Sequence, residues 1–427
     1  MSGLAEVTSP PYDVIFEDKE NQLMAADPHN VVRLILPRPV PGRPGEEYHD
    51  AAESLRQWKD EQILVTDPAP VLYVYEQASA IGDGLGWVQR GLIGAVRLVP
   101  PEAGVVLPHE DVSPGPVAGR LALMEATQAN LEPIFLLYDG LGAAGHAGGG
   151  TGAGGEPGAA ARIVTETASR EPLIDTRTPD RLRHRLWAVT DPADLAAIAA
   201  DLAPRQALIA DGHHRYAAYR QLQARRHRGG SGPGPWDYGL ALLVDSASYP
   251  PRIGAIHRVI PGLDVQHAVK LAAPAFTAMR VPGKLDELPA ALSALAEASG
   301  DGTAFVLAGD ECAYLISHPD PDQVRAAMPA GRSAAWRALP AAILQELLIT
   351  TLWKLTDDEE SVRIVHHDAE AALRSAQAAG GTAVLCSPMS PSEVYAVAAR
   401  GEKVPRKSTS FAPKPRTGLV LRSFAQG

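Results

Sequence analysis

The segment from residue 207 to residue 218, ALIADGHHRYAA, constrains the fold more than any other part of the 427-residue chain. Its apolar start predicts a short buried strand, which ends at the turn pair Asp211-Gly212. The residues that follow have a helical composition. A strand that turns directly into a helix points the first N–H groups of the helix at whatever lies above the turn, and such a place favours anions. We therefore predict an anion-binding strand–turn–helix unit.

Four chemically active side chains crowd this turn, those of Asp211, His213, His214 and Arg215. Gly212 allows the backbone to approach a phosphate, and Arg215 is expected to hold its charge together with the helix N-terminus. Asp211 is expected to orient a histidine or to bind a magnesium ion. The alternative is that Asp211 only caps the helix and Arg215 is only a surface charge. Because few structural turns need all four side chains, we favour the phosphate site.

Two other loops are candidates for function. The loop of Pro108, His109, Glu110 and Asp111 follows a strand and precedes a helix, and loops on rigid scaffolds often carry function. The order of the elements predicts that Glu110 lies beside the Asp211 turn at one sheet edge. The segment 403–414, KVPRKSTSFAPK, is either a phosphate-binding loop or a charged, solvated one. In the first case its phosphate ligands are predicted to be Lys407, Ser408 and Thr409.

Composition limits the class of protein. A hydrophobic fraction of 45% and a charged fraction of 21% are typical of soluble globular chains. The net charge of −11 argues against binding to nucleic acid, which needs a basic surface. The sequence shows no signal peptide and no apolar run long enough for a membrane span, so we expect a cytoplasmic protein without a membrane partner. Cys312 and Cys386 are expected to be buried free thiols.

Strand and helix patterns alternate along the chain with several hairpins, which predicts an α/β class with mixed (α+β) sheets. We divide the sequence into an N-terminal α/β part (1–100), a phosphate-binding core (101–260) and a C-terminal α/β part (261–427). Residues 30–37 are predicted to form a strand that ends at a proline. Residues 140–158 contain ten glycines and are expected to be a flexible insertion outside the binding site.

Motifs along most of the chain identify it as a member of a bacterial and archaeal family catalogued as domain of unknown function ten-fifteen. They include Pro-Pro-Tyr-Asp-Val-Ile, Asn-Leu-Glu-Pro-Ile-Phe, Ala-Asp-Gly-His-His-Arg-Tyr and Pro-Arg-Lys-Ser-Thr-Ser-Phe, at residues 10–15, 130–135, 210–216 and 405–411. The family name implies no activity.

Residues 108–222 also resemble, in the order of their motifs, the ParB/sulfiredoxin superfamily and its free serine kinases. Those kinases carry Pro-His-Glu, then a helix, a Pro-Ile strand and Asp-Gly-His-His-Arg, which match residues 108–110, 133–134 and 211–215 here. The superfamily's phosphate box, G-x-x-R-x-x-A, is present as Gly212, Arg215 and Ala218. Sulfiredoxin chemistry needs a cysteine in this motif, and residues 211–215 contain none.

The second resemblance implies a ParB/sulfiredoxin-like nucleotide-binding core with N- and C-terminal extensions. It implies a nucleotide, ATP or ADP, and Mg²⁺ as cofactors, with the phosphates and the metal held by Asp211, Gly212, His213, His214 and Arg215. Glu110 becomes the general base on a hydroxyl group, with His109 and Asp211 as its catalytic neighbours.

The expected function is therefore a nucleotide-dependent small-molecule kinase, with free serine as the first acceptor to test. The alternatives are a nucleotide-binding regulatory switch and a conserved protein without catalysis. The partners are a nucleotide and a small hydroxyl acceptor, and the oligomeric state is left open. We expect Arg215→Ala to weaken nucleotide binding by about 2 kcal/mol and to leave the fold intact, taking Arg215 as a surface residue.

Overall fold

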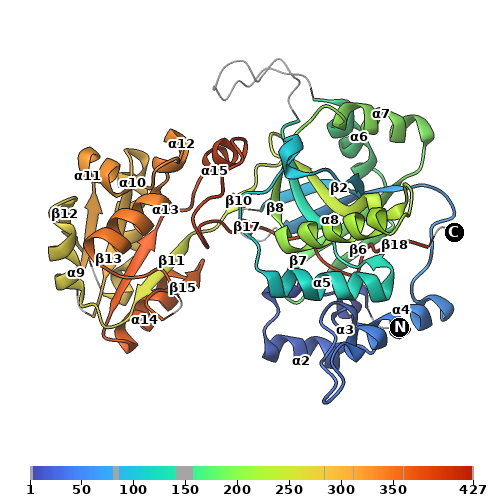
Figure 1. Cartoon of the computed structure of the whole chain (residues 1–427), viewed down its shortest axis with the longest axis horizontal. Helices are drawn as coiled ribbons and strands as arrows, with labels where there is room; N and C mark the ends of the chain where they lie inside the picture. The colour runs from blue at the N-terminus through green and yellow to red at the C-terminus, as the bar shows by residue number, and fades with distance from the viewer. Residues whose placement is uncertain are drawn as a thin grey trace. The chain divides into compact units, whose positions relative to one another are not determined.

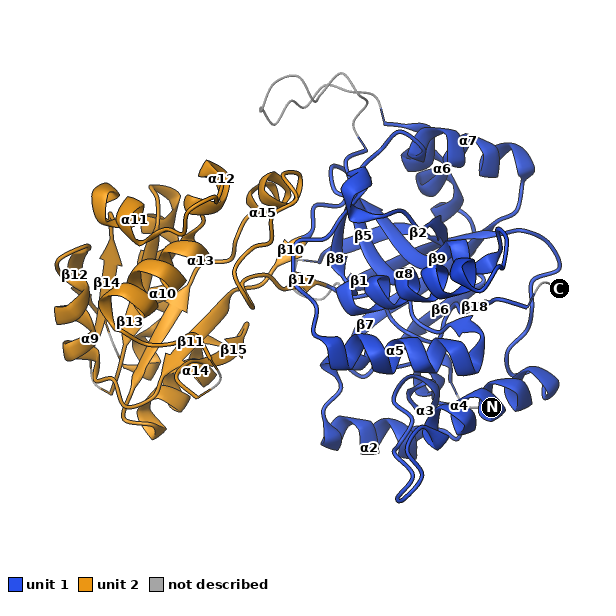
Figure 2. Ribbon diagram, viewed as in Figure 1, with its two compact units in different colours: residues 1–251, 413–427 blue, residues 252–412 orange. Residues whose placement is uncertain are grey.

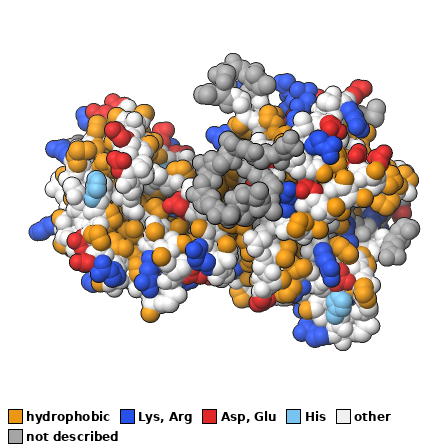
Figure 3. Space-filling view, turned by 90° about the horizontal axis from the view of Figure 1, so that it is seen from above, with side chains coloured by type: hydrophobic (Ala, Val, Ile, Leu, Met, Phe, Trp, Pro, Cys, Tyr) orange, Lys and Arg blue, Asp and Glu red, His pale blue; other side chains and the backbone are white. Residues whose placement is uncertain are grey.

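The computed structural model describes residues 3–79, 86–140, 157–282, 284–310, 312–358 and 360–425. The chain forms two compact units (Figure 2). Unit 1 comprises residues 1–251 and 413–427, and unit 2 comprises residues 252–412. The predicted glycine-rich insertion lies outside the described residues except at its two ends. On the face in Figure 3, acidic and basic side chains of the described residues are interspersed.

Unit 1 is built on an eight-stranded mixed sheet, which confirms the predicted α/β class. Two pairs of neighbouring strands, β3–β8 and β5–β9, are parallel, and the other pairs are antiparallel. The sheet takes strands from both sides of the predicted division at residue 100. Across the sheet, the strands are β3 (Val106–Leu107), β8 (Ala207–Asp211), β5 (Ile134–Tyr138), β9 (Tyr238–Asp245), β2 (Val88–Arg97), β1 (Leu72–Ser79), β7 (Leu182–Val189) and β6 (Ile174–Arg177).

Helices α5 and α8 lie side by side (Figure 1) and pack against strands β8, β5 and β9 of this sheet. Leu121 of α5 and Tyr216 and Leu222 of α8 share a buried apolar cluster with Ile209 of β8. Burial of this cluster fixes the direction in which α8 leaves the strand. The helices of unit 1 are α1 (Leu4–Val7), α2 (Glu17–Ala26), α3 (Val32–Ile35), α4 (Glu46–Asp60), α5 (Pro114–Thr127), α6 (Ala159–Ala168), α7 (Pro192–Leu202) and α8 (His213–Arg228).

The strand predicted at residues 30–37 is wrong, because this segment contains the short helix α3. The Asn30 side chain accepts a hydrogen bond from Val32 N at 2.9 Å, which favours a helical turn at this point. Val32, Leu34 and Ile35 are all buried. A short apolar run that is buried on every side has no periodicity that separates strand from helix.

The end of the chain returns to unit 1. Strand β18 (Arg422–Ser423) pairs with β4 (Ala129–Asn130), and Ser9 forms an antiparallel bridge with Thr417. Residues 413–417 are therefore held beside the N-terminal segment.

Unit 2 contains a six-stranded antiparallel sheet and a short pair, β10 (Arg252–Ile253) with β17 (Phe411–Ala412). Across the larger sheet, the strands are β12 (Thr277–Val281), β14 (Ala313–Ser317), β13 (Ala304–Ala308), β16 (Thr382–Cys386), β11 (Ile256–Ile260) and β15 (Arg363–His366). The helices are α9 (Val265–Ala272), α10 (Leu288–Gly300), α11 (Pro321–Ala327), α12 (Ala334–Arg337), α13 (Pro340–Ala342), α14 (Ala369–Ala378) and α15 (Pro391–Ala398), with a π-helix at Ile343–Leu352.

Both cysteines lie in unit 2 and are free thiols, Cys312 buried and Cys386 half-buried. No helix within the described ranges has both the length and the apolar character that a bilayer crossing requires.

His184 of β7 belongs to a buried polar cluster in unit 1. Its Nδ1 lies 2.8 Å from the Tyr75 hydroxyl, and its Nε2 lies 3.0 Å from Thr178 Oγ1. Burial, aided by the charge of Arg416, lowers the pKa of His184 to about 4. The folded state therefore keeps this imidazole neutral at pH values where the unfolded chain is protonated.

We expect this cluster to make unit 1 sensitive to mild acid. The unfolded histidine has a pKa near 6.5, so between about pH 6.5 and pH 4 the unfolded state binds more protons and stability falls as the pH falls. Between pH 7 and pH 5, His184 should contribute a loss of about 2 kcal/mol. Urea denaturation at both pH values measures this loss, which should be absent in His184→Asn. An equal loss in the variant and the wild type would contradict the assignment.

Candidate functional site

The loop after β3 and the turn after β8 lie together at one edge of the unit 1 sheet. The two strands are parallel neighbours, with Val106 opposite Ala207 and Leu107 opposite Leu208. Because parallel strands end at the same sheet edge, Glu110 comes close to the Asp211 turn. The Glu110 Oε2 atom lies 3.8 Å from His213 Nδ1, so the expected juxtaposition of the two loops is present.

Glu110 is flanked by two imidazoles. Its Oε1 lies 4.0 Å from His109 Nε2, and its side chain is 33% exposed, whereas His109 and His213 are buried. The two rings meet edge to face at 4.5 Å between centroids. The site therefore has a carboxylate open to a ligand and backed by two buried histidines.

Hydrogen bonds from the loop fix the tautomers of two histidines. His213 Nε2 accepts a bond from His109 N at 3.2 Å, and His214 Nε2 accepts one from Ser113 N at 3.1 Å. In a neutral imidazole with an accepting Nε2, the proton sits on Nδ1. The Nδ1–H of His213 therefore faces Glu110.

Gly212 forms the turn between β8 and α8 in a left-handed conformation, with φ of +94°. A Cβ at this position would lie 2.9 Å from Ile134 Cγ2 and 3.2 Å from Arg215 Nε. As the N-cap residue, Gly212 offers no side chain to cap the 16-residue helix α8. The first N–H groups of a helix have no intrahelical acceptor and favour an anion, as the sequence predicts for this turn.

Gly212→Ala should lower the free energy of unfolding by about 1–3 kcal/mol, because an L-residue is strained at positive φ and its methyl group meets Ile134. Urea denaturation measures the change. The matched control is Gly119→Ala, inside α5, where the nearest atom to a new Cβ is Tyr48 Oη at 3.4 Å. The control should be neutral or stabilising by up to about 1 kcal/mol. Equal effects of the two substitutions would contradict a requirement for glycine at the turn.

Beneath the turn, Asp211 and Arg215 form a buried ion pair rather than an open anion site. Arg215 Nη2 donates to Asp211 Oδ2, and Arg215 Nη1 donates to the Pro133 carbonyl at 2.6 Å. Arg215 is only 3% exposed. The expectation that Arg215 is a surface residue is therefore wrong, since the packing of α8 against the sheet turns its side chain inward.

Lys414, from the returning C-terminal segment, bridges two carboxylates. Its Nζ lies 2.6 Å from Asp211 Oδ1 and 2.5 Å from Asp13 Oδ2. Burial and the neighbouring Asp13 raise the pKa of Asp211, while Lys414 and Arg215 act against this. For Asp13, burial alone would raise the pKa, but Lys414 and Arg215 outweigh it, and the pKa is lowered.

A third buried carboxylate, Glu132, completes this charge cluster. Its Oε1 accepts a hydrogen bond from Tyr12 N at 3.0 Å, and its Oε2 lies 3.7 Å from Arg120 Nη1. Burial raises the pKa of Glu132, although Arg215 and Arg120 oppose the shift. The cluster contains three carboxylates and three cations, which makes it internally balanced: Asp13, Glu132 and Asp211 with Arg120, Arg215 and Lys414.

Both carboxylate oxygens of Asp211 have a cationic partner, Oδ2 in Arg215 and Oδ1 in Lys414. Its role as a magnesium ligand stays a prediction. The described residues contain no group of three or more histidine, cysteine, aspartate or glutamate side chains placed to hold a metal.

The predicted phosphate residues Lys407, Ser408 and Thr409 belong to unit 2. Lys407 is exposed and has a positive φ of 52°, whereas Ser408 and Thr409 are buried. Ser408 Oγ donates to the Pro405 carbonyl at 2.7 Å. Their role in phosphate binding stays a prediction.

Sequence reasoning assigned no role to Asp13, Arg120 or Glu132. It considered Lys414 only as part of the segment 403–414, either a phosphate-binding loop or a solvated one. Asp13 and Glu132 stand inside motifs that carry the family resemblance, Pro-Pro-Tyr-Asp and Asn-Leu-Glu-Pro. An acidic residue inside each motif was the available signal for Asp13 and Glu132. The spacing of the sequence does not predict that either residue lies near Lys414.

No curated protein matches the sequence of this chain. Among solved structures, a free serine kinase in complex with AMP is 14% identical, with a TM-score of 0.35 over 74% of this chain and 87% of that one. A conserved hypothetical protein from Pyrococcus furiosus is 13% identical, with a TM-score of 0.34 over 74% and 90%. SbnI with a C-terminal truncation, from Staphylococcus aureus, is 11% identical, with a TM-score of 0.34 over 75% and 82%. These TM-scores are too low to support an argument about function.

The sequence itself matches a family model described as "Protein of unknown function (DUF1015)" over residues 1–342. This match covers most of the chain and includes both loops of the candidate site, with Glu110 and the Asp211 turn. The chain therefore belongs to the DUF1015 family.

Proposed function

We propose that unit 1 is a nucleotide-dependent phosphotransferase that acts on the hydroxyl group of a small molecule, with free serine as the first acceptor to test. The observation that carries this proposal is the position of Glu110. Its carboxylate is accessible, lies 3.8 Å from His213 Nδ1 and stands at the N-terminus of α8. These positions support the proposal that Glu110 acts as a base beside anion-binding N–H groups and imidazole donors at one sheet edge.

In the proposed reaction, Glu110 takes up the proton of the substrate hydroxyl. The oxygen of that hydroxyl attacks the terminal phosphorus of ATP or ADP. The bond from that phosphorus to the bridging oxygen breaks, and the nucleotide leaves with one phosphate fewer. The Nδ1–H of His213 orients the Glu110 carboxylate. Phosphoryl transfer depends mainly on positioning and on electrostatic stabilisation of the phosphate oxygens.

The nucleotide phosphates are assigned to the first turn of α8. Its N–H groups and the imidazole of His214 supply donors, and the positive φ of Gly212 lets the strand turn directly into the helix. Asp211 and Arg215 act as positioning residues in this proposal, since their mutual bond fixes the turn from below. No step is assigned to magnesium.

The direct test is turnover by the full chain with labelled ATP or ADP and a panel of small hydroxy compounds that includes serine. The proposal predicts transfer of the label to an acceptor, in amounts that match the nucleotide consumed. Tight nucleotide binding without product from any acceptor would favour the regulatory switch instead. Absence of both binding and turnover would contradict the proposal altogether.

A further inference from the structure

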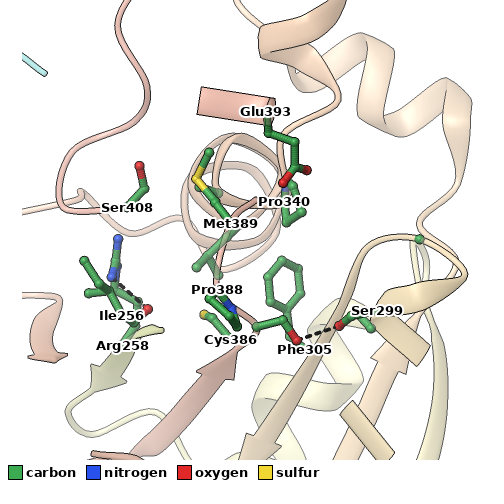
Figure 4. Close-up of a pocket in the computed structure, with 15 residues that line it drawn as sticks. Ile256, Arg258, Ser299, Phe305, Pro340, Cys386, Pro388, Met389, Glu393 and Ser408 are labelled. Carbon is green, nitrogen blue, oxygen red and sulfur yellow. Dashed lines mark hydrogen bonds between the residues drawn. The ribbon is translucent and has the colours of Figure 1, made fainter. Parts of the chain in front are cut away.

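Unit 2 contains a cavity of about 110 Å³ between β11, β13, β16 and the loop that leads into α15 (Figure 4). A cavity of roughly 150 Å³ accepts benzene, so this one encloses about four non-hydrogen atoms, and a slightly longer ligand would extend toward its open side. Much of its wall is apolar, formed by Phe305, Leu344 and Met389. Two exposed residues, Gly302 and Pro388, also line it, which places part of the cavity at the surface.

Arg258 of β11 supplies a buried positive charge to this cavity. It is 5% exposed, and Figure 4 shows its side chain on the same side as Ser408. Within the described part of the chain, no carboxylate forms an ion pair with Arg258; Asp357 acts on it only at longer range and is paired with Arg406 at 3.6 Å. The guanidinium donates instead to four backbone carbonyls, those of Ile256 (3.3 Å), His257 (3.5 Å), Arg406 (3.2 Å) and Lys407 (2.9 Å).

A buried charge without a counter-ion is unfavourable, and a bound anion removes this penalty. We propose that the cavity binds a small organic monocarboxylate, with its carboxylate on Arg258 and its short apolar body against Phe305, Leu344 and Met389. Both Nη atoms of Arg258 already donate to carbonyls, so the carboxylate is expected to pair with the guanidinium through its single negative charge. Burial lowers the pKa of Arg258, which agrees with the absence of a protein counter-ion.

The other polar groups of the cavity favour a carboxylate over a phosphate. Ser299 and Ser387 bond to each other at 2.8 Å, and Ser408 bonds to a backbone carbonyl. Glu393 also lines the cavity, and its Oε2 accepts bonds from Ser390 N and Oγ, both at 2.7 Å. A phosphate dianion would exceed the single charge of Arg258, and Glu393 would repel it more strongly than it repels a monocarboxylate. This inference concerns unit 2 alone and does not depend on phosphotransfer in unit 1.

The test uses propionate as the probe and ligand-observed NMR of the full chain at constant ionic strength. Propionate should bind saturably, and its neutral isostere propionamide should not. Arg258→Lys keeps a positive charge but loses the guanidinium that four carbonyls hold in place, so it should weaken binding about tenfold or more. Arg374→Ala, an exposed arginine on α14, is the matched control and should leave binding unchanged.

Ala341→Phe provides a second variant that keeps Arg258 and its carbonyl contacts. Ala341 lines the cavity, so the larger ring should fill the space and abolish propionate binding even where Arg258→Lys fails to fold. Equal binding of propionamide, or propionate binding that both variants leave unchanged, would overturn the proposal. Inorganic phosphate that binds where propionate does not would overturn the choice of a carboxylate.

Discussion

Glu110→Gln should lower phosphotransfer by about 10²- to 10⁴-fold, the usual contribution of a positioned general base. Glutamine keeps the size and hydrogen-bonding reach of glutamate but does not take up a proton at neutral pH. The nucleotide phosphates are assigned to the α8 N-terminus, so nucleotide affinity should change by only a few-fold. Initial rates at saturating nucleotide and acceptor measure the first effect, and calorimetry measures the second.

His109 is the nearest substitute base, because its Nε2 lies 4.0 Å from Glu110 Oε1. The double variant Glu110→Gln/His109→Asn should therefore remove the residual activity. Glu61→Gln is a control of the same chemistry on an exposed residue and should retain full turnover. Wild-type rates in Glu110→Gln would show that the base lies elsewhere.

Arg215→Ala should destabilise unit 1 by about 3–5 kcal/mol, the range for removing one partner of a buried ion pair. The substitution leaves the buried carboxylate of Asp211 without its guanidinium partner and the Pro133 carbonyl without its donor. The large effect reverses the expectation, drawn from the sequence, that the fold tolerates this change. Urea denaturation measures it as a shift of the unit 1 transition.

Arg225→Ala is the matched control for this experiment. Arg225 lies on the same helix, is 52% exposed and pairs with Glu125 at the surface, where ion pairs contribute about 0–1 kcal/mol. A loss of stability in Arg215→Ala no larger than in Arg225→Ala would contradict the positioning role assigned to the buried pair.

Local sequence patterns were sufficient to predict the strand–turn–helix unit that carries the candidate site. The apolar run before Asp211 and the helical composition after Gly212 correspond to β8 and α8. The order of strands and helices was also sufficient to bring Glu110 to the same edge, because β3 and β8 are parallel neighbours. The pattern gave the wrong element at residues 30–37, where the Asn30 side-chain bond favours a helical turn and the buried apolar run has no periodicity that separates strand from helix.

The buried cluster of carboxylates and cations beneath the turn could not be predicted from the sequence. Asp13 and Lys414 are four hundred residues apart, and their contact depends on the return of the C-terminal segment to unit 1. Arginine is a residue type that often binds phosphate, yet the Arg215 side chain donates to the Asp211 carboxylate. Only three-dimensional packing distinguishes an arginine that faces a ligand from one that holds the turn in place.

Hydrogen–deuterium exchange of the full chain, with and without saturating ATP or ADP, tests the central claim most directly. A nucleotide held at the proposed site should protect the backbone amides of residues 109–113 and 212–216, which lie in the two loops at the sheet edge. Peptides from residues 252–412 should exchange at unchanged rates. Protection confined to unit 2, or no protection at saturating nucleotide, would contradict the assignment of nucleotide binding to the Glu110 edge of unit 1.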